Sequence, residues 1–232
     1  MNNVDTEFSK HASYYSNYNI IQNKVLKHLL SKVNSKPKYI LDLGCGDGSL
    51  CTNINWQYNH FTAIDFAKGM LELHPASDKI ECIYGNFNNQ VLFDNLHMNK
   101  YDCIFSASAL QWSIDLDSVF KNIKAFNAPV ALAIFTSNTF KTLNSTAKID
   151  SILRSSQEVD KLQKKYFDAE FEVVNYKLEF DSVKDIFTYI KKSGVSGSRK
   201  VLSYKQTKEL MKNYPTNYLE FEVVFITSFS KS

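Results

Sequence analysis

The stretch ILDLGCGDGSL, residues 40–50, sets three alternating glycines directly behind an apolar run that has the pattern of a buried strand. Gly44 and Gly46 allow the backbone to turn tightly and to approach a ligand without a Cβ in the way. The helix that we expect after them begins with backbone N–H groups that have no partner inside the helix. The spacing is G-x-G-x-G, whereas a dinucleotide-binding turn has G-x-G-x-x-G. Asp42, inside the strand, suits a cationic ligand group better than a pyrophosphate, because two anions repel each other.

A second acidic residue strengthens this interpretation. The run FTAIDF, residues 61–66, has the pattern of a strand that ends in Asp65, about twenty residues after the glycines. At that position an acid holds a ribose by accepting hydrogen bonds from both of its hydroxyl groups. Alternating glycines alone are a weak signal, but two strands that carry Asp42 and Asp65 around them form a specific pattern. The sequence therefore predicts a ligand-binding turn.

Strand and helix patterns alternate over the first 136 residues. Strand patterns occupy residues 39–43, 61–65, 80–84, 101–105 and 130–135, and helical patterns occupy residues 8–34, 67–73 and 115–126. This alternation predicts βαβ units and a parallel sheet with helices on both faces. Residues 138–165 and 183–191 are then helical in pattern, and long strand patterns at 171–180 and 219–229 can pair as a hairpin. We predict an α/β fold with a Rossmann-like seven-stranded mixed sheet, helices on both faces and an antiparallel C-terminal strand pair.

The length and composition favour one domain over residues 1–232. The chain is 44% hydrophobic and 22% charged, which is ordinary for a folded protein, and its length suits a single core. We expect residues 1–36 to form an N-terminal helical cap and residues 37–136 to form the ligand-binding core. Residues 137–170 and 181–213 are expected to form a helical lid that bounds the substrate region.

Several functional classes are disfavoured by the same composition. No apolar run approaches the roughly 20 residues that span a bilayer, and the first ten residues are polar, so we expect a cytoplasmic protein without membrane contact. The four cysteines form no CxxC pair, which argues against a metal site or a disulfide framework. A net charge of +3 is too small to indicate nucleic-acid binding. Residues 184–212, however, carry eight basic and two acidic side chains, a net charge of +6 that indicates either a solvated helix face or a docking surface.

The glycine-rich turn and Asp65 resemble the class I S-adenosylmethionine-dependent methyltransferases. The resemblance implies that S-adenosylmethionine is the cofactor, that the turn cradles its methionine end and that a third-strand loop reads adenine. In that loop this chain has Asn86 where the family usually has Asp, and an amide oxygen can still accept a hydrogen bond from the adenine amine. The cofactor-binding residues implied are Tyr15, Gln22, Asp42, Gly44, Cys45, Gly46, Asp65, Phe66, Asn86, Phe87 and Ser106.

Other segments resemble one branch of these enzymes, the malonyl–acyl-carrier-protein O-methyltransferases of biotin synthesis. The run SASALQW, residues 106–112, ends in a Gln-Trp pair typical of that branch. Residues 8–22, FSKHASYYSNYNIIQ, and residues 178–197, LEFDSVKDIFTYIKKSGVSG, are similar to its opening and to its lid. Residues 202–210, LSYKQTKEL, resemble its C-terminal region. Lys192 and Ser193 depart from the usual lid residues, so the resemblance is weakest there.

The implied reaction methylates the free carboxylate of a malonyl thioester carried by acyl carrier protein or by coenzyme A. A carboxylate has a pKa near ~4, so the acceptor is already ionised and needs no general base. Catalysis then depends on orientation. The residues expected to shape and close the catalytic pocket are Tyr15, Gln111, Trp112 and Phe180. Of the two arginines, Arg199 in the lid is favoured over Arg154 as the bidentate partner of the substrate carboxylate.

Two alternatives stay open at this point. One is a methyltransferase that acts on another small carboxylic acid or on a hydroxyl group, such as that of a quinone precursor. The other is a non-catalytic domain that keeps the fold and binds a partner. The intact Asp42, Gly44, Gly46 and Asp65 favour an enzyme, since a domain without a ligand has no physical need for them.

Overall fold

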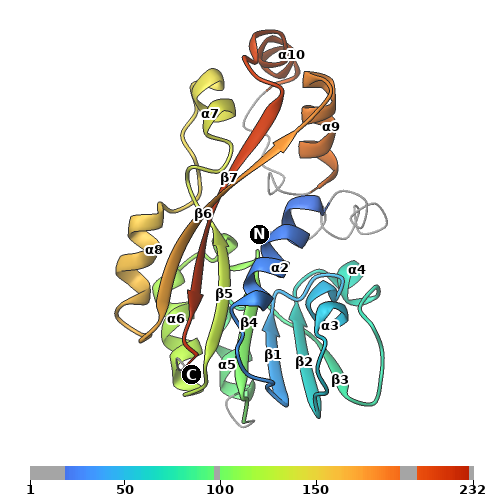
Figure 1. Ribbon diagram of the computed structural model, residues 1–232, viewed down its shortest axis with the longest axis vertical. Helices are drawn as coiled ribbons and strands as arrows, with labels where there is room; N and C mark the ends of the chain where they lie inside the picture. The colour runs from blue at the N-terminus through green and yellow to red at the C-terminus, as the bar shows by residue number, and fades with distance from the viewer. Residues whose placement is uncertain (1–18, 97–99, 194–202, 230–232) are drawn as a thin grey trace.

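The computed structural model describes residues 19–96, 100–193 and 203–229, which form a seven-stranded mixed sheet with helices on both faces (Figure 1). The strand order is β3-β2-β1-β4-β5-β7-β6, and β7 runs in the direction opposite to that of the other six strands. The strands are β1 (Tyr39–Leu43), β2 (His60–Asp65), β3 (Ile80–Tyr84), β4 (Cys103–Ala107), β5 (Val130–Phe135), β6 (Glu170–Glu179) and β7 (Tyr218–Thr227). The predicted fold class and the predicted C-terminal hairpin are confirmed.

The register of the central strands brings their carboxyl ends to one edge of the sheet. Leu43 pairs with Ile64 between β1 and β2, and Asp42 pairs with Phe105 between β1 and β4. All six residues of β5 are buried, as expected for a parallel strand that is covered on both faces. The loops that follow β1, β2 and β4 therefore meet at this edge, where open α/β sheets bind ligands.

The helices divide between the two faces of the sheet (Figure 1). They are α2 (Ile20–Ser31), α3 (Ser49–Asn53), α4 (Lys68–Leu71), α5 (Gln90–Leu96), α6 (Leu116–Ala125), α7 (Lys141–Ala147), α8 (Ser156–Gln163), α9 (Val183–Lys192) and α10 (Tyr204–Asn213), with a short 3-10 helix η1 (Leu110–Trp112). One core cluster joins α2, α3, α9 and α10 to the sheet, and a second joins α5, α6 and α8 to the opposite face.

The helical pattern over residues 138–165 forms two helices, α7 and α8, in place of one. The residue after α7, Lys148, adopts a left-handed conformation with φ of 54°, which stops the helix. Ser155 then starts α8 with a capping box, in which its hydroxyl accepts from the Glu158 N–H while the Glu158 side chain accepts from the Ser155 N–H. These local signals outweigh the continuous polar pattern that suggested a single helix.

Two searches of the described residues complete this description. None of their helices has the length and apolar character needed to cross a membrane. Within the same residues, no group of three or more His, Cys, Asp or Glu side chains is placed to hold a metal ion. The four cysteines are free thiols, with Cys45, Cys51 and Cys103 buried and Cys82 exposed.

Candidate active site

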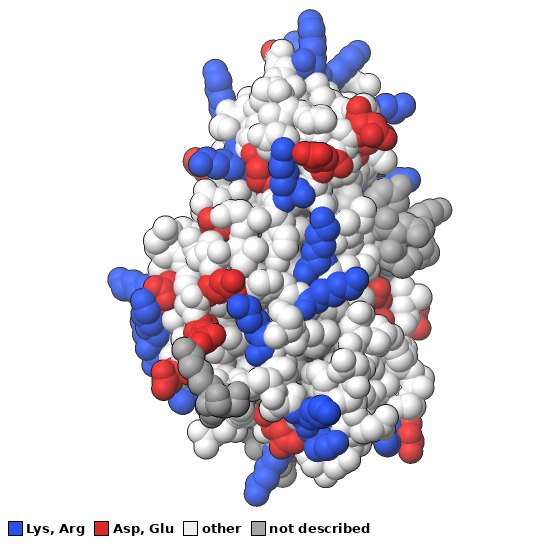
Figure 2. Space-filling model, in the orientation of Figure 1, with Lys and Arg blue, Asp and Glu red and all other residues white. Residues whose placement is uncertain are grey.

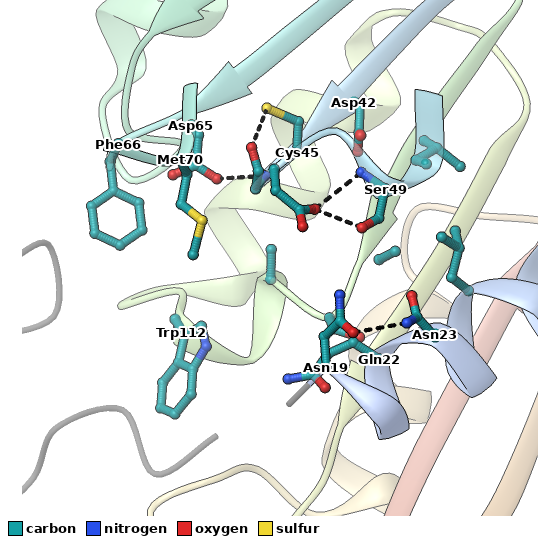
Figure 3. Close-up of a pocket in the computed structure, with 18 of the residues that line it drawn as sticks. Asn19, Gln22, Asn23, Asp42, Cys45, Ser49, Asp65, Phe66, Met70 and Trp112 are labelled. Atoms are coloured by element: carbon teal, nitrogen blue, oxygen red, sulfur yellow. Dashed lines mark hydrogen bonds between the residues drawn. The ribbon is translucent and has the colours of Figure 1, made fainter. Parts of the chain in front are cut away.

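A pocket lies at the carboxyl ends of β1, β2 and β4, against the first turns of α2 (Figure 3). Its lining combines carboxylates, amides, open backbone and aromatic rings. The residues that line it are Asn19, Gln22, Asn23, Leu26, Asp42, Gly44, Cys45, Gly46, Asp47, Ser49, Leu50, Asp65, Phe66, Met70, Phe87, Ala107, Ser108, Ala109 and Trp112. The sequence-predicted turn and ribose acid thus lie in one cavity.

The glycine-rich turn forms one wall of this pocket. Gly44 and Gly46 have φ values of 78° and 56°, in the left-handed region that favours glycine. A Cβ at Gly44 would lie 2.2 Å from the Cβ of Ala109, so the turn packs directly against the segment after β4. A Cβ at Gly46 would meet nothing within 4 Å, so the backbone there faces open space. Gly44 thus allows close packing, whereas Gly46 leaves room for a ligand.

Asp65 is tied to this turn through both of its oxygens. Its Oδ2 accepts from the Gly46 N–H at 2.9 Å and its Oδ1 accepts from the Ala67 N–H at 2.8 Å. A carboxylate oxygen can accept more than one hydrogen bond, so these backbone bonds do not prevent a ligand hydroxyl from donating to Asp65. The side chain is oriented before any ligand arrives.

Asp42 is a buried carboxyl with an unsatisfied oxygen. It is 1% exposed, and its Oδ1 has no hydrogen-bond partner. Burial, and then the negative charge of Asp65, raises the pKa of Asp42 well above its ordinary value. Burial likewise raises the pKa of the Cys45 thiol, with Asp42 and Asp65 adding to the effect, so this thiol is not a nucleophile. The unsatisfied oxygen of Asp42 is suited to a cationic group that donates hydrogen bonds.

Three amide side chains, from the N-cap residue Asn19 and from Gln22 and Asn23 of α2, form the side of the pocket across from Asp65, Phe66 and Met70 (Figure 3). The Asn23 amide donates to Asn19 Oδ1 at 2.8 Å, and Gln22 Oε1 is buried without a partner. Gln22 was predicted from the sequence, whereas Asn19 and Asn23 were missed. Their i, i+4 spacing on a helix that leads into β1 was the available signal.

The segment after β4 supplies the aromatic wall. Ser108 has φ of 64°, rare for a residue with a side chain, and η1 follows it. Trp112 lines the pocket. Gln111 is outside the lining: its Nε2 donates to the Ser108 carbonyl at 2.6 Å and so braces the turn. Ser106 is fully buried and donates to the Leu43 carbonyl at 2.7 Å, tying β4 to β1.

Residues 41–131 match a family model described as a methyltransferase domain. The chain has the fold of the class I methyltransferases. YcgJ of Bacillus subtilis has the same fold, with 12% identity, a TM-score of 0.62 and coverage of 89% of this chain and 99% of that one. So does phosphoethanolamine N-methyltransferase 2 of Haemonchus contortus, solved in complex with S-adenosyl-L-methionine, with 13% identity, a TM-score of 0.54 and coverage of 91% and 53%.

Sequences similar to this one match nearly the whole chain. A malonyl–acyl-carrier-protein O-methyltransferase of Buchnera aphidicola is 25% identical over 90% of this chain and 89% of its own length. One of Brevibacillus brevis is 23% identical over 98% of this chain and 95% of its own length. The similarity thus extends beyond the cofactor-binding core to both ends of the chain.

Class I methyltransferases use S-adenosylmethionine, and the pocket of this chain fits that cofactor. The unsatisfied oxygen of Asp42 suits the ammonium group, and the open space beside Gly46 admits the methionine chain. Asp65 suits the ribose. Phe66 and Phe87 offer apolar faces for the adenine. When bound, the cofactor supplies an electrophilic methyl group.

Asn86 was expected to contact adenine, but in the structure its side chain hydrogen-bonds within its own loop. Asn86 Oδ1 accepts from both the backbone N–H and the side-chain amide of Asn88, each at 2.9 Å, and Asn86 does not line the pocket. Its oxygen shapes the loop after β3, and Phe87 is the residue of this loop that reaches the cavity. The loop after β3 therefore presents an apolar ring to the pocket.

The remaining predicted residues fall outside the pocket lining or outside the described residues. Phe180 packs against Tyr189, with ring centroids 5.3 Å apart, and does not line the pocket. Arg154 donates hydrogen bonds to Ser113 and Ile114. Tyr15 and Arg199 lie outside the described residues, so their predicted roles stay predictions.

Proposed function

We propose that the chain is an S-adenosylmethionine-dependent carboxyl O-methyltransferase that methylates the malonyl group of malonyl–acyl carrier protein. The relatives that carry this name match the chain over nearly its whole length, and this observation carries the proposal. The resemblance of residues 106–112 and 178–197 to the same branch supports it.

The chemistry of the described pocket agrees with a carboxylate acceptor. No histidine, lysine or tyrosine belongs to the described lining, and burial raises the pKa of the Cys45 thiol beyond use as a base. Of the three carboxyls in the lining, we assign Asp42 and Asp65 to the cofactor, and Asp47 Oδ1 accepts from the Ser49 backbone N–H and hydroxyl. A hydroxyl or amine acceptor would need a general base, whereas a carboxylate with a pKa near ~4 arrives ionised.

The remaining task of the protein is orientation. The acceptor must approach the methyl group in line, at roughly 3–3.5 Å before attack. In this proposal Trp112 bounds the acceptor side and excludes water from it, while the small residues Ala107 and Ala109 leave space beside the methyl group. Asp65 and the glycine-rich turn hold the cofactor in a fixed position against that wall.

The direct test is methyl transfer to purified malonyl–acyl carrier protein, read by intact mass. We expect the carrier to gain the mass of one methyl ester when S-adenosylmethionine is present. Acetyl–acyl carrier protein is the matched control, because it lacks the free carboxylate and should stay unchanged. If the protein binds S-adenosylhomocysteine but methylates neither malonyl–acyl carrier protein nor malonyl-coenzyme A, the proposed substrate is wrong.

A further inference from the structure

The peptide groups directly after Trp112 are held from two sides by side chains that do not line the pocket. On one side, Asn88 Oδ1 accepts from the Ile114 N–H at 2.8 Å. On the other side, Arg154 Nη2 donates to the Ile114 carbonyl and to the Ser113 carbonyl, each at 3.0 Å, while Nη1 donates to the Ser113 hydroxyl at 3.3 Å. Neither Asn88 nor Arg154 belongs to the lining of the pocket.

Arg154 is a firm anchor for these contacts. Its own carbonyl accepts from the Ser137 N–H at 2.9 Å, and the next residue, Ser155, opens the capping box of α8. In the described part of the chain Arg154 forms no ion pair, so its hydrogen bonds go to neutral oxygens. A planar guanidinium with several donors can satisfy adjacent carbonyl groups at once, which a lysine cannot do.

Asn88 is equally well oriented. Its backbone N–H and its side-chain amide both donate to Asn86 Oδ1 at 2.9 Å, which leaves the Asn88 oxygen directed at Ile114. The residue between them, Phe87, lines the pocket. The loop after β3 and the turn after β4 are thus connected through one peptide group.

The turn that carries Trp112 depends on such support because its own backbone provides little. The 3-10 helix η1 is three residues long, and it is closed by the Trp112 N–H to the Ala109 carbonyl and by the Ser113 N–H to the Leu110 carbonyl. Hydrogen bonds of this i to i+3 type have poorer geometry than those of an α-helix. The buried Ser113, at 6% exposure, would also lose its carbonyl partner without Arg154.

We propose that Asn88 and Arg154 are positioning residues. They hydrogen-bond to opposite sides of the peptide group between Ser113 and Ile114 and thereby fix Trp112 as the wall of the pocket on the acceptor side. The proposal rests on the proposed function, because the wall acts only when an acceptor is methylated. Arg154 serves this purpose without touching the substrate. Its loss should misplace the wall by a fraction of an ångström to an ångström, and a misplacement of that size costs up to about 100-fold in rate.

The first arm of the test needs no acceptor. The chain has two tryptophans, so a Trp56→Phe background leaves Trp112 as the only indole. In that background we expect Arg154→Met and Asn88→Ala to lower the fluorescence anisotropy of Trp112 and to shift its emission, with affinity for S-adenosylhomocysteine within about threefold of the parent. Lys165→Met is the matched control: it removes the 2.9 Å ion pair between Lys165 and Asp117, which also joins the end of α8 to α6. The control should leave the Trp112 signal unchanged.

The second arm measures methyl transfer. We expect Arg154→Met and Asn88→Ala to lower kcat by about 10- to 100-fold with little change in the KM for S-adenosylmethionine. Because both side chains act on one peptide, the double variant should lose less than the product of the two single losses. Arg154→Lys should restore part of the activity, and Asn88→Asp, which keeps an acceptor for the Ile114 N–H, should restore more than Asn88→Ala.

The outcomes separate the two proposals. An unchanged Trp112 signal in both Arg154→Met and Asn88→Ala would overturn the positioning role, whatever the acceptor is. A changed signal in a protein that never methylates malonyl–acyl carrier protein would support the grip on Trp112 and reject the proposed substrate. If Arg154→Met fails to show a cooperative thermal transition, Asn88→Ala and Arg154→Lys decide the question by the same two readouts.

Discussion

At the scale of single residues, Asp65 has both a structural and a ligand-binding task. Each oxygen accepts one backbone hydrogen bond, and the side chain lines the pocket in which we expect the ribose to bind. We expect Asp65→Ala to weaken S-adenosylhomocysteine binding by about 10- to 100-fold, since hydrogen bonds to charged groups are worth about 1.5–3 kcal/mol. Titration calorimetry measures this directly. Asp65→Asn keeps one acceptor oxygen and should lose less, and equal affinity in all three proteins would refute the ribose assignment.

We expect Asp42 to lower the stability of the ligand-free protein and to strengthen cofactor binding. Its pKa is raised by burial and then by Asp65, so the folded state holds the proton more tightly than the unfolded state. The stability that depends on this group is therefore full below its ordinary pKa of ~4 and is lost as the pH rises toward the raised value. Asp42→Asn should raise the free energy of unfolding of the ligand-free protein at neutral pH by about 0.5–2 kcal/mol.

This gain should shrink as the pH falls and should vanish below ~4, where the carboxyl of the parent is protonated in both states. Asp42→Asn should also weaken cofactor binding, because an amide lacks the charge that faces the ammonium group. Denaturant unfolding across this pH range, with and without S-adenosylhomocysteine, measures both effects. A variant that is no more stable than the parent at neutral pH would contradict the account of Asp42.

The residues found from the sequence are those whose role follows from local backbone chemistry. Alternating glycines and an acid at a strand end are such features, and Gly44, Gly46 and Asp65 all lie in the pocket. The direction of a side chain depends on tertiary structure, so the partners of the Asn86 and Gln111 side-chain oxygens could not be predicted from the sequence. Asn86 Oδ1 accepts a hydrogen bond within its own loop, and Gln111 Oε1 is buried without a partner. Asn19 was missed because the facing of a helix is set by what it packs against.

At the scale of elements, two glycines of the glycine-rich turn have different tasks: Gly44 allows close packing, and Gly46 leaves space for the ligand. A Cβ at Gly44 would collide with Ala109, and the left-handed φ adds strain, so we expect Gly44→Ala to cost about 2–5 kcal/mol of stability. Gly46→Ala carries only the backbone strain, about 1–2 kcal/mol, but its methyl group enters the space open to the ligand. Thermal unfolding should rank Gly44→Ala as the less stable variant. Gly46→Ala should lose cofactor affinity beyond its loss of stability, and a variant that binds normally would show that the ligand lies elsewhere.

The strands were predictable because each is a short apolar run between clear breaks, whereas the helices were harder. The short α5 buries only Phe93 and Leu96, which is too little periodicity to stand out from a loop. The split between α7 and α8 rests on one left-handed residue and one capping box. Such local stops are visible in the sequence only as Lys148 and Ser155, neither of which is a strong breaker on its own.

At the scale of the whole molecule, positive charge gathers at the end formed by α9 and α10. Figure 2 shows blue side chains projecting from this end; in Figure 1 α10 lies at the top of the molecule, and α9 lies between it and the level of α2. We define the α9–α10 surface by its exposed lysines, Lys184, Lys191, Lys205, Lys208 and Lys212. These helices contain only two acidic residues, Asp185 and Glu209. In the proposed function an acidic carrier presents the acceptor at the pocket that α2 lines, so we propose this surface as its docking site.

The salt dependence of turnover tests whether this surface docks acyl carrier protein. Exposed charges act mainly on the association rate and are screened beyond about 10 Å at 0.1 M salt. We expect Lys205→Glu, Lys208→Glu and Lys212→Glu together to raise the KM for malonyl–acyl carrier protein, most strongly at low salt, and to leave kcat unchanged. The matched control reverses Lys121, Lys124 and Lys161, which are exposed on α6 and α8 away from this end. It changes the net charge equally and should have a much smaller effect.

Malonyl-coenzyme A separates docking from a change at the pocket itself. This thioester carries the same reacting carboxylate but no protein surface, so reversing the charges of α10 should alter its KM little. A carrier protein gains its long-range attraction from many acidic side chains acting together, and that attraction falls steeply with ionic strength. If the α10 variant affects both thioesters equally, or no more than the α6–α8 control does, the carrier docks on another surface and the lysines of α10 are an ordinary solvated face.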